Sequence, residues 1–144
     1  MNHLLKAAAI ILGMICMSNT SCNKEEIDGV KTSGFNTPIE LGVNDKAILP
    51  KENKELLVTL ISLSDSRCAK DVQCVWAGNA IAEVQLTCND GSQSIIKLCI
   101  GECDKNMKLS DTLTVGLNNK IYTVVLNDVK GEGVNKAVLT ITKK

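Results

Sequence analysis

From about Pro38 onward, the apolar residues of this chain come in short runs that turn-forming residues separate. A period of two along such a run is typical of a half-buried β-strand. No stretch shows the sustained spacing of three and four residues that an amphipathic helix needs. The pattern therefore predicts an all-β fold, and it is clearest at residues 80–88, where one face carries Ala80, Ala82, Val84, Leu86 and Cys88.

About eight runs have strand character, and they cover residues 39–41, 47–49, 56–63, 80–88, 94–100, 113–117, 121–129 and 137–142. Short strands at such spacing are typical of an antiparallel β-sandwich, Ig-like in style, or of a partly open barrel. Residues 51–57 contain good helix formers, so a short helix is an alternative there, although we favour the strand. We expect a single β-domain over residues 37–144.

The composition excludes several classes of function. Sixteen basic and sixteen acidic residues give a net charge of zero, so the electrostatic footprint of a nucleic-acid-binding protein is absent. The aromatic residues are Phe35, Trp76 and Tyr122, which leaves no row of rings for stacked bases. The predicted core is therefore aliphatic, and we expect no nucleic-acid partner.

The N-terminus has the features of an export signal. Lys6 precedes an apolar run at residues 7–17, which has the length of a signal-peptide hydrophobic region and is too short to span a bilayer comfortably. Small polar residues at positions 18–21 then lead to Cys22. This arrangement resembles the lipobox of bacterial lipoproteins, with Asn19 where that motif usually has Leu. The resemblance implies a signal peptide at residues 1–21 and a lipid on Cys22 that attaches the protein to a membrane.

The residues that follow Cys22 refine the expected location. Asn23-Lys24-Glu25-Glu26 resembles the signal that directs Bacteroidetes-type lipoproteins to the outer face of the outer membrane. The resemblance implies an outer membrane lipoprotein of the cell envelope that is exposed at the surface; the alternative is a solvated, charged tether. Residues 22–36 are polar, and we expect them to form a lipid-anchored flexible tether.

Cleavage before Cys22 would remove the single histidine of the chain, His3. Without histidine, the mature chain cannot build a Ser-His-Asp triad, a Cys-His pair or a histidine metal site. Paired carboxylates occur only at the frequency that a chain with 22% charged residues gives by chance. We therefore expect no enzymatic activity, no catalytic residues and no cofactor.

The most distinctive segment is residues 65–80, which contains Cys68 and Cys74. In an exported protein, two cysteines at this spacing are expected to form a disulfide. Trp76 would lie on the side of Cys74 and pack on that disulfide, while Arg67 would brace the loop through Asp65, Asp71 or backbone carbonyls. The alternative is that Arg67 and Trp76 are exposed recognition residues, since both types are common at binding hot spots.

The pattern Asp65-Ser66-Arg67-Cys68, then Cys74-Val75-Trp76-Ala77-Gly78, resembles a family of small exported bacterial proteins that has no established reaction. The similarity extends over most of residues 38–144, and only this block is specific. The family usually has Pro after the first cysteine, where this chain has Ala69. The resemblance implies a fold and no activity.

Three further cysteines follow this segment. Cys99 and Cys103 are predicted to form a second disulfide because Gly101 permits a tight turn, which leaves Cys88 as a buried free thiol. A bridge between Cys88 and Cys103 stays open. The alternative is a thiolate metal or redox site at Cys99 and Cys103, joined by Cys88, because copper(I) and zinc accept sulfur ligands. We favour the disulfides, and therefore no metal site.

Together these observations predict a monomeric cell-envelope lipoprotein that acts as a non-catalytic binding or structural module. Its partner would be a protein or a small molecule that the sequence does not identify. Two alternatives remain: a small protease-inhibitor-like module that presents loops at one end of a sandwich, and a thiolate metal-binding or redox protein.

Overall fold

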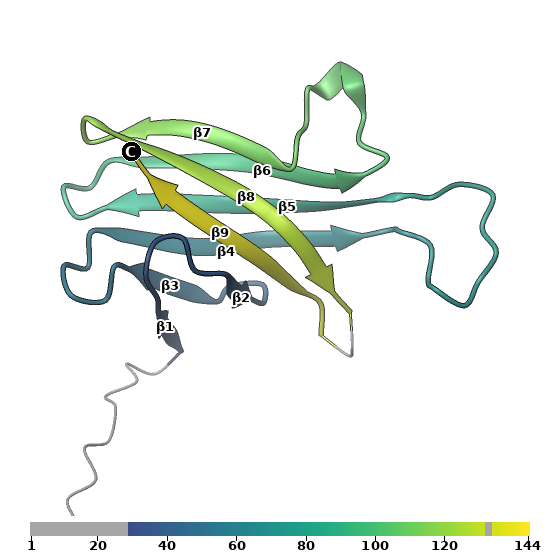
Figure 1. The fold of residues 1–144 in the computed structure, drawn as a ribbon, viewed down its shortest axis with the longest axis horizontal. Helices are drawn as coiled ribbons and strands as arrows, with labels where there is room; N and C mark the ends of the chain where they lie inside the picture. Colours follow the sequence, from purple (N-terminus) through teal and green to yellow (C-terminus); the bar gives the residue numbers. More distant parts are fainter. Residues whose placement is uncertain (1–28, 132–133) are drawn as a thin grey trace, which may run out of the picture.

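The computed structural model describes residues 29–131 and 134–144. Within this part of the chain, nine strands form two sheets that face each other as a β-sandwich (Figure 1). One short 3-10 helix, η1 (Lys105–Met107), interrupts the connection after the sixth strand. The strands are β1 (Val30–Thr32), β2 (Ile39–Leu41), β3 (Lys46–Leu49), β4 (Leu56–Asp65), β5 (Asn79–Cys88), β6 (Gln93–Gly101), β7 (Thr112–Leu117), β8 (Lys120–Lys130) and β9 (Lys136–Lys143).

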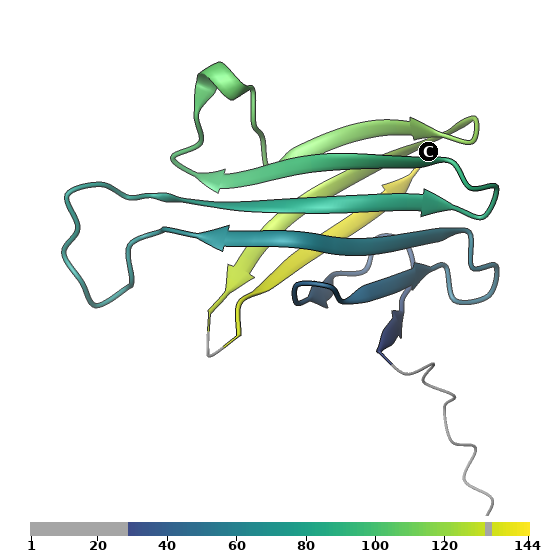
Figure 2. The ribbon, with the colours of Figure 1, turned by 180° about the vertical axis from the view of Figure 1, so that it is seen from behind.

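The two sheets differ in size and strand order. The larger sheet has the order β1-β3-β4-β5-β6, and the smaller sheet has the order β2-β9-β8-β7 (Figure 2). All neighbouring strands pair antiparallel except β1 and β3, which run parallel. The sandwich rather than the partly open barrel is therefore the architecture of this chain.

All eight predicted strands are present, and residues 51–53 form a turn instead of the alternative helix. The ninth strand, β1, lies in the segment that was expected to be a flexible tether. The expected boundary at residue 37 is therefore wrong for the described part of that segment. Val30–Thr32 pairs with β3, and the ring of Phe35 stacks on Tyr122 with its centroid 6.1 Å away. The predicted signal peptide, Cys22 and the first part of the tether lie outside the described residues.

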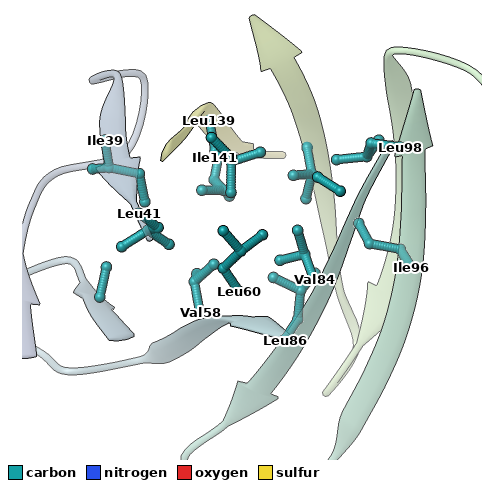
Figure 3. Close-up of a cluster of buried hydrophobic side chains, with 14 of the residues drawn as sticks. Ile39, Leu41, Val58, Leu60, Val84, Leu86, Ile96, Leu98, Leu139 and Ile141 are labelled. Atoms are coloured by element: carbon teal, nitrogen blue, oxygen red, sulfur yellow. The ribbon is translucent and has the colours of Figure 1, made fainter. Parts of the chain in front are cut away.

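The core is aliphatic, as the composition indicated. The face of β5 that the alternation assigned to the interior is buried along the whole strand. It meets residues of β4 from the same sheet and of β9 from the opposite one. Figure 3 shows these side chains pointing toward one another between the sheets, with labels on Ile39, Leu41, Val58, Leu60, Val84, Leu86, Ile96, Leu98, Leu139 and Ile141. Full burial of one such side chain contributes about 1.5–3 kcal/mol, so this layer is the main source of stability.

In residues 29–131 and 134–144, no helix has the length and apolar character needed to cross a membrane.

Candidate functional site

Three connections lie at one end of the sandwich, on the right in Figure 1. They are the β4–β5 loop (residues 66–78), the β6–β7 loop (residues 102–111), and the connection between β8 and β9, of which the structure describes residues 131 and 134–135. We call this group the loop end. It holds both disulfides, Cys68–Cys74 in the first loop and Cys99–Cys103 at the base of the second.

The loop end also gathers exposed apolar side chains. Val75 is 96% exposed and the adjacent Trp76 is 69% exposed. Eight large hydrophobic residues are exposed in the part of the chain that the structure describes, and five of them belong to these loops: Val72, Val75, Trp76, Met107 and Val134. Single exposed apolar residues are ordinary, but Val75 and Trp76 are adjacent on one projecting loop, which makes this loop a candidate interaction surface.

Trp76 is 69% exposed and is not part of the sandwich core, so the expectation that it packs on the Cys68–Cys74 disulfide as a core residue is wrong. The antiparallel pairing of β4 and β5 ends at Asp65 and Ala80, beyond which the loop extends past the sheets. A residue two positions after Cys74 is therefore outside the sandwich and has no second sheet to pack against. The recognition alternative, which expected Trp76 to be exposed, agrees with this position.

For Arg67, in contrast, the expected bracing role is confirmed, because its side chain holds the loop through several hydrogen bonds. Its Nε and Nη2 donate to the two carboxylate oxygens of Asp65 at 2.9 and 2.8 Å. Its Nη2 also donates to the backbone carbonyl of Val129 at 2.6 Å, and its Nη1 donates to Asp128 Oδ1 at 3.2 Å. Asp71, the other expected carboxylate partner, takes no part in these contacts. The guanidinium thus joins the β4–β5 loop to the end of β8.

The electrostatics agree with this bracing role. Hydrogen bonds from the Arg67 guanidinium lower the pKa of Asp65, and they outweigh the opposing effect of burial. Hydrogen bonds to Asp65, and then to Asp128, raise the pKa of Arg67 despite its partial burial. Charge-assisted bidentate pairs of this kind are stronger than neutral hydrogen bonds and also fix orientation.

Asp128 and Val129 were missed as partners of Arg67. They lie about sixty residues away in sequence, and β8 has an irregular register between Leu126 and Asp128 that turns Asp128 toward the loop. The only sequence signal was a carboxylate near the end of a strand, and such residues are common. The contact becomes visible only once the two sheets face each other.

The first two loops are also joined at their bases. Glu102 N donates to the Gly78 carbonyl oxygen at 2.9 Å, and Asn79 Nδ2 donates to the Glu102 carbonyl oxygen at 3.1 Å. Gly78 and Gly101 approach each other closely, since a Cβ on Gly101 would lie 2.7 Å from the Gly78 carbonyl oxygen. The exposed apolar residues therefore stand on a connected base rather than on independent loops.

A shallow, polar groove lies between the β4–β5 loop and the ends of β8 and β9. Cationic and anionic side chains line it in equal number: Arg67, Lys70, Lys130 and Lys136 against Glu40, Asp65, Asp71 and Asp128. The guanidinium of Arg67 already forms ion pairs with two of these carboxylates, those of Asp65 and Asp128. The groove therefore offers no excess charge for a small ionic ligand.

The cysteines pair as the sequence predicted. Cys99 and Cys103 are joined, Cys68 and Cys74 are joined, and Cys88 is a buried free thiol. The open alternative, a bridge between Cys88 and Cys103, does not form. A thiolate site at Cys99 and Cys103 would require reduction of their disulfide. Among residues 29–131 and 134–144, no three His, Cys, Asp or Glu side chains are grouped as metal ligands.

The opposite end of the sandwich holds a buried polar cluster that the sequence did not reveal. Tyr122 Oη donates to Glu55 Oε1 at 2.6 Å, while Lys143 Nζ and Lys120 Nζ lie 2.8 and 3.2 Å from Glu55 Oε2. Burial raises the pKa of Glu55, but these three donors outweigh burial and lower it to about 2. All polar groups of the cluster have partners, so its arrangement is structural rather than reactive.

Comparisons of the chain with protein-family models, with curated proteins and with solved structures returned no match. The function is therefore inferred from the geometry of the loop end.

Proposed function

We propose that this protein is a lipid-anchored module of the cell envelope that binds a protein partner through its loop end. The observation that carries the proposal is the group of exposed apolar side chains, Val75 and Trp76 foremost, on loops joined at their bases. Water-exposed apolar surface of this kind stabilises nothing in the free molecule, and it contributes binding free energy when a partner covers it.

Rigidity supports binding as the role of this surface. The Cys68–Cys74 disulfide, the Arg67 contacts and the hydrogen bonds between Gly78, Asn79 and Glu102 all fix the loops before any partner arrives. A preorganised loop loses less conformational entropy on binding than a flexible one. Tryptophan is also among the residues most enriched at hot spots of protein interfaces.

Location supports the same role. The two disulfides indicate an extracytoplasmic protein, because disulfides persist in oxidising compartments. For the finer location we rely on the export signal and the lipobox-like residues before Cys22, which favour anchoring to the outer membrane. The described chain begins at β1, away from the loop end, in both views (Figures 1 and 2). An anchor before β1 would leave the loop end free to meet a partner.

Site-specific photo-cross-linking in native envelopes tests the binding role. A photoreactive phenylalanine analogue is placed at Val75 and, as a matched control, at Ile121, which is 46% exposed at the opposite end. We expect a discrete protein adduct from position 75 and none from position 121. Equal adducts from both positions, or none from either, would refute binding through the loop end.

Intact mass of the mature protein from envelopes tests the anchor. We expect the chain to begin at an acylated Cys22 and to contain two disulfides and the free Cys88 thiol. A chain that lacks the lipid would remove the membrane anchor from the proposal and leave the loop-end binding role to the cross-linking result.

A further inference from the structure

We infer that the partner is an extracytoplasmic endopeptidase, and that the loop end is a wedge that enters its substrate cleft and blocks it. This inference rests on the proposed function, because it names the partner of the same surface. Shape, side-chain chemistry and rigidity of the β4–β5 loop carry it.

Shape comes first. The β4–β5 loop extends beyond the ends of the neighbouring strands and forms the tip of the molecule on its long axis (Figures 1 and 2). Val75 and Trp76 stand on this projection and are mostly free of protein contacts. A narrow convex tip is complementary to a concave, largely preformed pocket, and such pockets in proteins are chiefly substrate or ligand clefts.

The exposed side chains of this loop determine which kind of cleft fits. An endopeptidase cleft accepts successive side chains of a polypeptide in adjacent subsites. Val75 and Trp76 present an aliphatic and an aromatic side chain in sequence, directly after Cys74. Apolar subsites suit this pair, whereas a subsite built for a basic side chain, such as that of trypsin, does not. The inference thus selects enzymes with apolar specificity.

Rigidity distinguishes an inhibitor from a substrate. The loop is closed at its base by the Cys68–Cys74 disulfide, by a hydrogen bond from Cys68 N to the Ala77 carbonyl oxygen at 2.9 Å, and by the antiparallel pairing of β4 with β5. A cut at any peptide bond of the loop would leave both new ends attached to paired strands. The product would therefore stay in place instead of diffusing from the cleft.

The neighbouring loops extend the contact. Met107 on the β6–β7 loop and Val134 beside β9 are also exposed at this end. Contacts from these loops would widen the interface beyond one peptide segment, as protease–inhibitor complexes of standard size require. The mixed charges of the groove beside Arg67 would lie at the polar rim of such an interface.

Inhibition assays test the inference. The oxidised mature protein carrying Lys70→Ala, which removes the exposed basic side chain of the same loop, is titrated against papain, chymotrypsin and elastase, with trypsin as the enzyme whose basic specificity does not fit Val75 and Trp76. We expect inhibition of at least one of the first three and none of trypsin. Trp76→Ala and Val75→Asp should each weaken that inhibition roughly tenfold or more. Ile121→Asp at the opposite end should not, and thermal unfolding should show that all variants fold.

Several results would overturn the inference. These are inhibition of none of the first three enzymes, inhibition that the Val75 and Trp76 variants retain, and cleavage of the loop without inhibition. A blue shift of the fluorescence of Trp76, the single tryptophan of the chain, on phosphatidylglycerol–phosphatidylethanolamine vesicles would assign the tip to a lipid surface instead. A Val75 adduct with a protein that is not an endopeptidase would overturn this inference alone, and the binding role would stand.

Discussion

Two residues hold the base of the β4–β5 loop by opposite means. Arg67 reaches across the sandwich with a long side chain, and its guanidinium contacts Asp65, Asp128 and the Val129 carbonyl. Gly78 is suited to its position because it has no side chain. Its backbone lies directly against that of Ser66, and its φ of +71° is one that other residues rarely adopt. Both are needed because the loop leaves the sheets at this point and must return to β5 in register.

Replacement of Arg67 by Lys should lower the free energy of unfolding by about 2 kcal/mol, because an ammonium group cannot make the bidentate contact and reach β8 together. Urea unfolding followed by circular dichroism measures the change. Lys70→Ala, in the same loop, serves as the control and should shift the midpoint little. An unchanged midpoint for Arg67→Lys would show that the guanidinium contacts do not brace the fold.

Gly78→Ala should destabilise the protein by about 3 kcal/mol or more, because its Cβ would lie 2.0 Å from the Ser66 carbonyl oxygen and the backbone must move. Gly91→Ala is the matched control. Gly91 has a similar φ of +87° but open space around it, so only the strain of about 1 kcal/mol should remain. Thermal unfolding of both variants measures the two losses of stability. Equal losses would contradict the argument that the close contact with Ser66 makes Gly78 the more sensitive position.

At the scale of strands, the sequence predicted the strands that bury one face. It did not predict pairings and contacts that depend on residues far away in the chain. β5 carries its burial in a period of two along its whole length, which the sequence displays directly, and β4 begins with the same alternation of burial. β1 has three residues and little burial, so its pairing with β3 leaves no pattern. The Glu55 cluster joins residues up to 88 positions apart, and such contacts follow from the topology alone.

The candidate site was predicted in part for the same reason. Both disulfides close short loops, so their spacing was visible in the sequence. The exposure of Trp76 was not visible, because it depends on where the pairing of β4 and β5 ends. The Arg67 contact with Asp128 depends in addition on the irregular register within β8.

The Glu55 carboxylate should make the stability of the folded protein decrease at acid pH. The pKa of Glu55 falls from an ordinary 4.5 to about 2 in the folded protein. A lowered folded-state pKa contributes stability above pH 4.5, and this contribution is lost as the pH falls toward 2. The shift corresponds to on the order of 3 kcal/mol at most. Urea unfolding at pH 6, 4 and 3 should show the loss.

Glu55→Gln isolates the contribution of this carboxylate. The variant should be less stable than the wild type at pH 6, and the difference between the two should shrink as the pH approaches 2. Tyr122→Phe removes one of the three donors, so it should reduce the same contribution in part. A constant difference between wild type and Glu55→Gln across this range would contradict the argument.

At the scale of the whole molecule, the two ends of the sandwich have different character. One end is closed by the buried cluster around Glu55 and Tyr122. The other carries both disulfides and, within the described residues, most of the large apolar side chains that are exposed. Between them the aliphatic core runs the length of the paired strands. The exposed apolar side chains of the loop end are therefore separated in space from the aliphatic core, and their replacement should leave the fold intact.

The double variant Cys68→Ala/Cys74→Ala tests this separation. Loss of a disulfide that spans six positions should lower the free energy of unfolding by about 2 kcal/mol through the entropy of the unfolded chain. The far-ultraviolet circular dichroism spectrum should keep its β character because the sheets do not depend on the loop. Loss of the β-type circular dichroism spectrum at 25 °C would show that the Cys68–Cys74 disulfide is needed for the sandwich itself.

If the proposed lipid anchor holds the chain at its N-terminus, the short parallel strand β1 has a mechanical consequence. Any force between the envelope and a bound partner would enter the fold at Val30–Thr32, which pairs only with β3 and contributes no residue to the buried core. This strand should therefore peel away first and lengthen the linkage, while the paired strands of the sandwich stay intact. Under force, the protein would therefore unfold locally at β1, near the proposed anchor, while the loop end stays folded and able to bind.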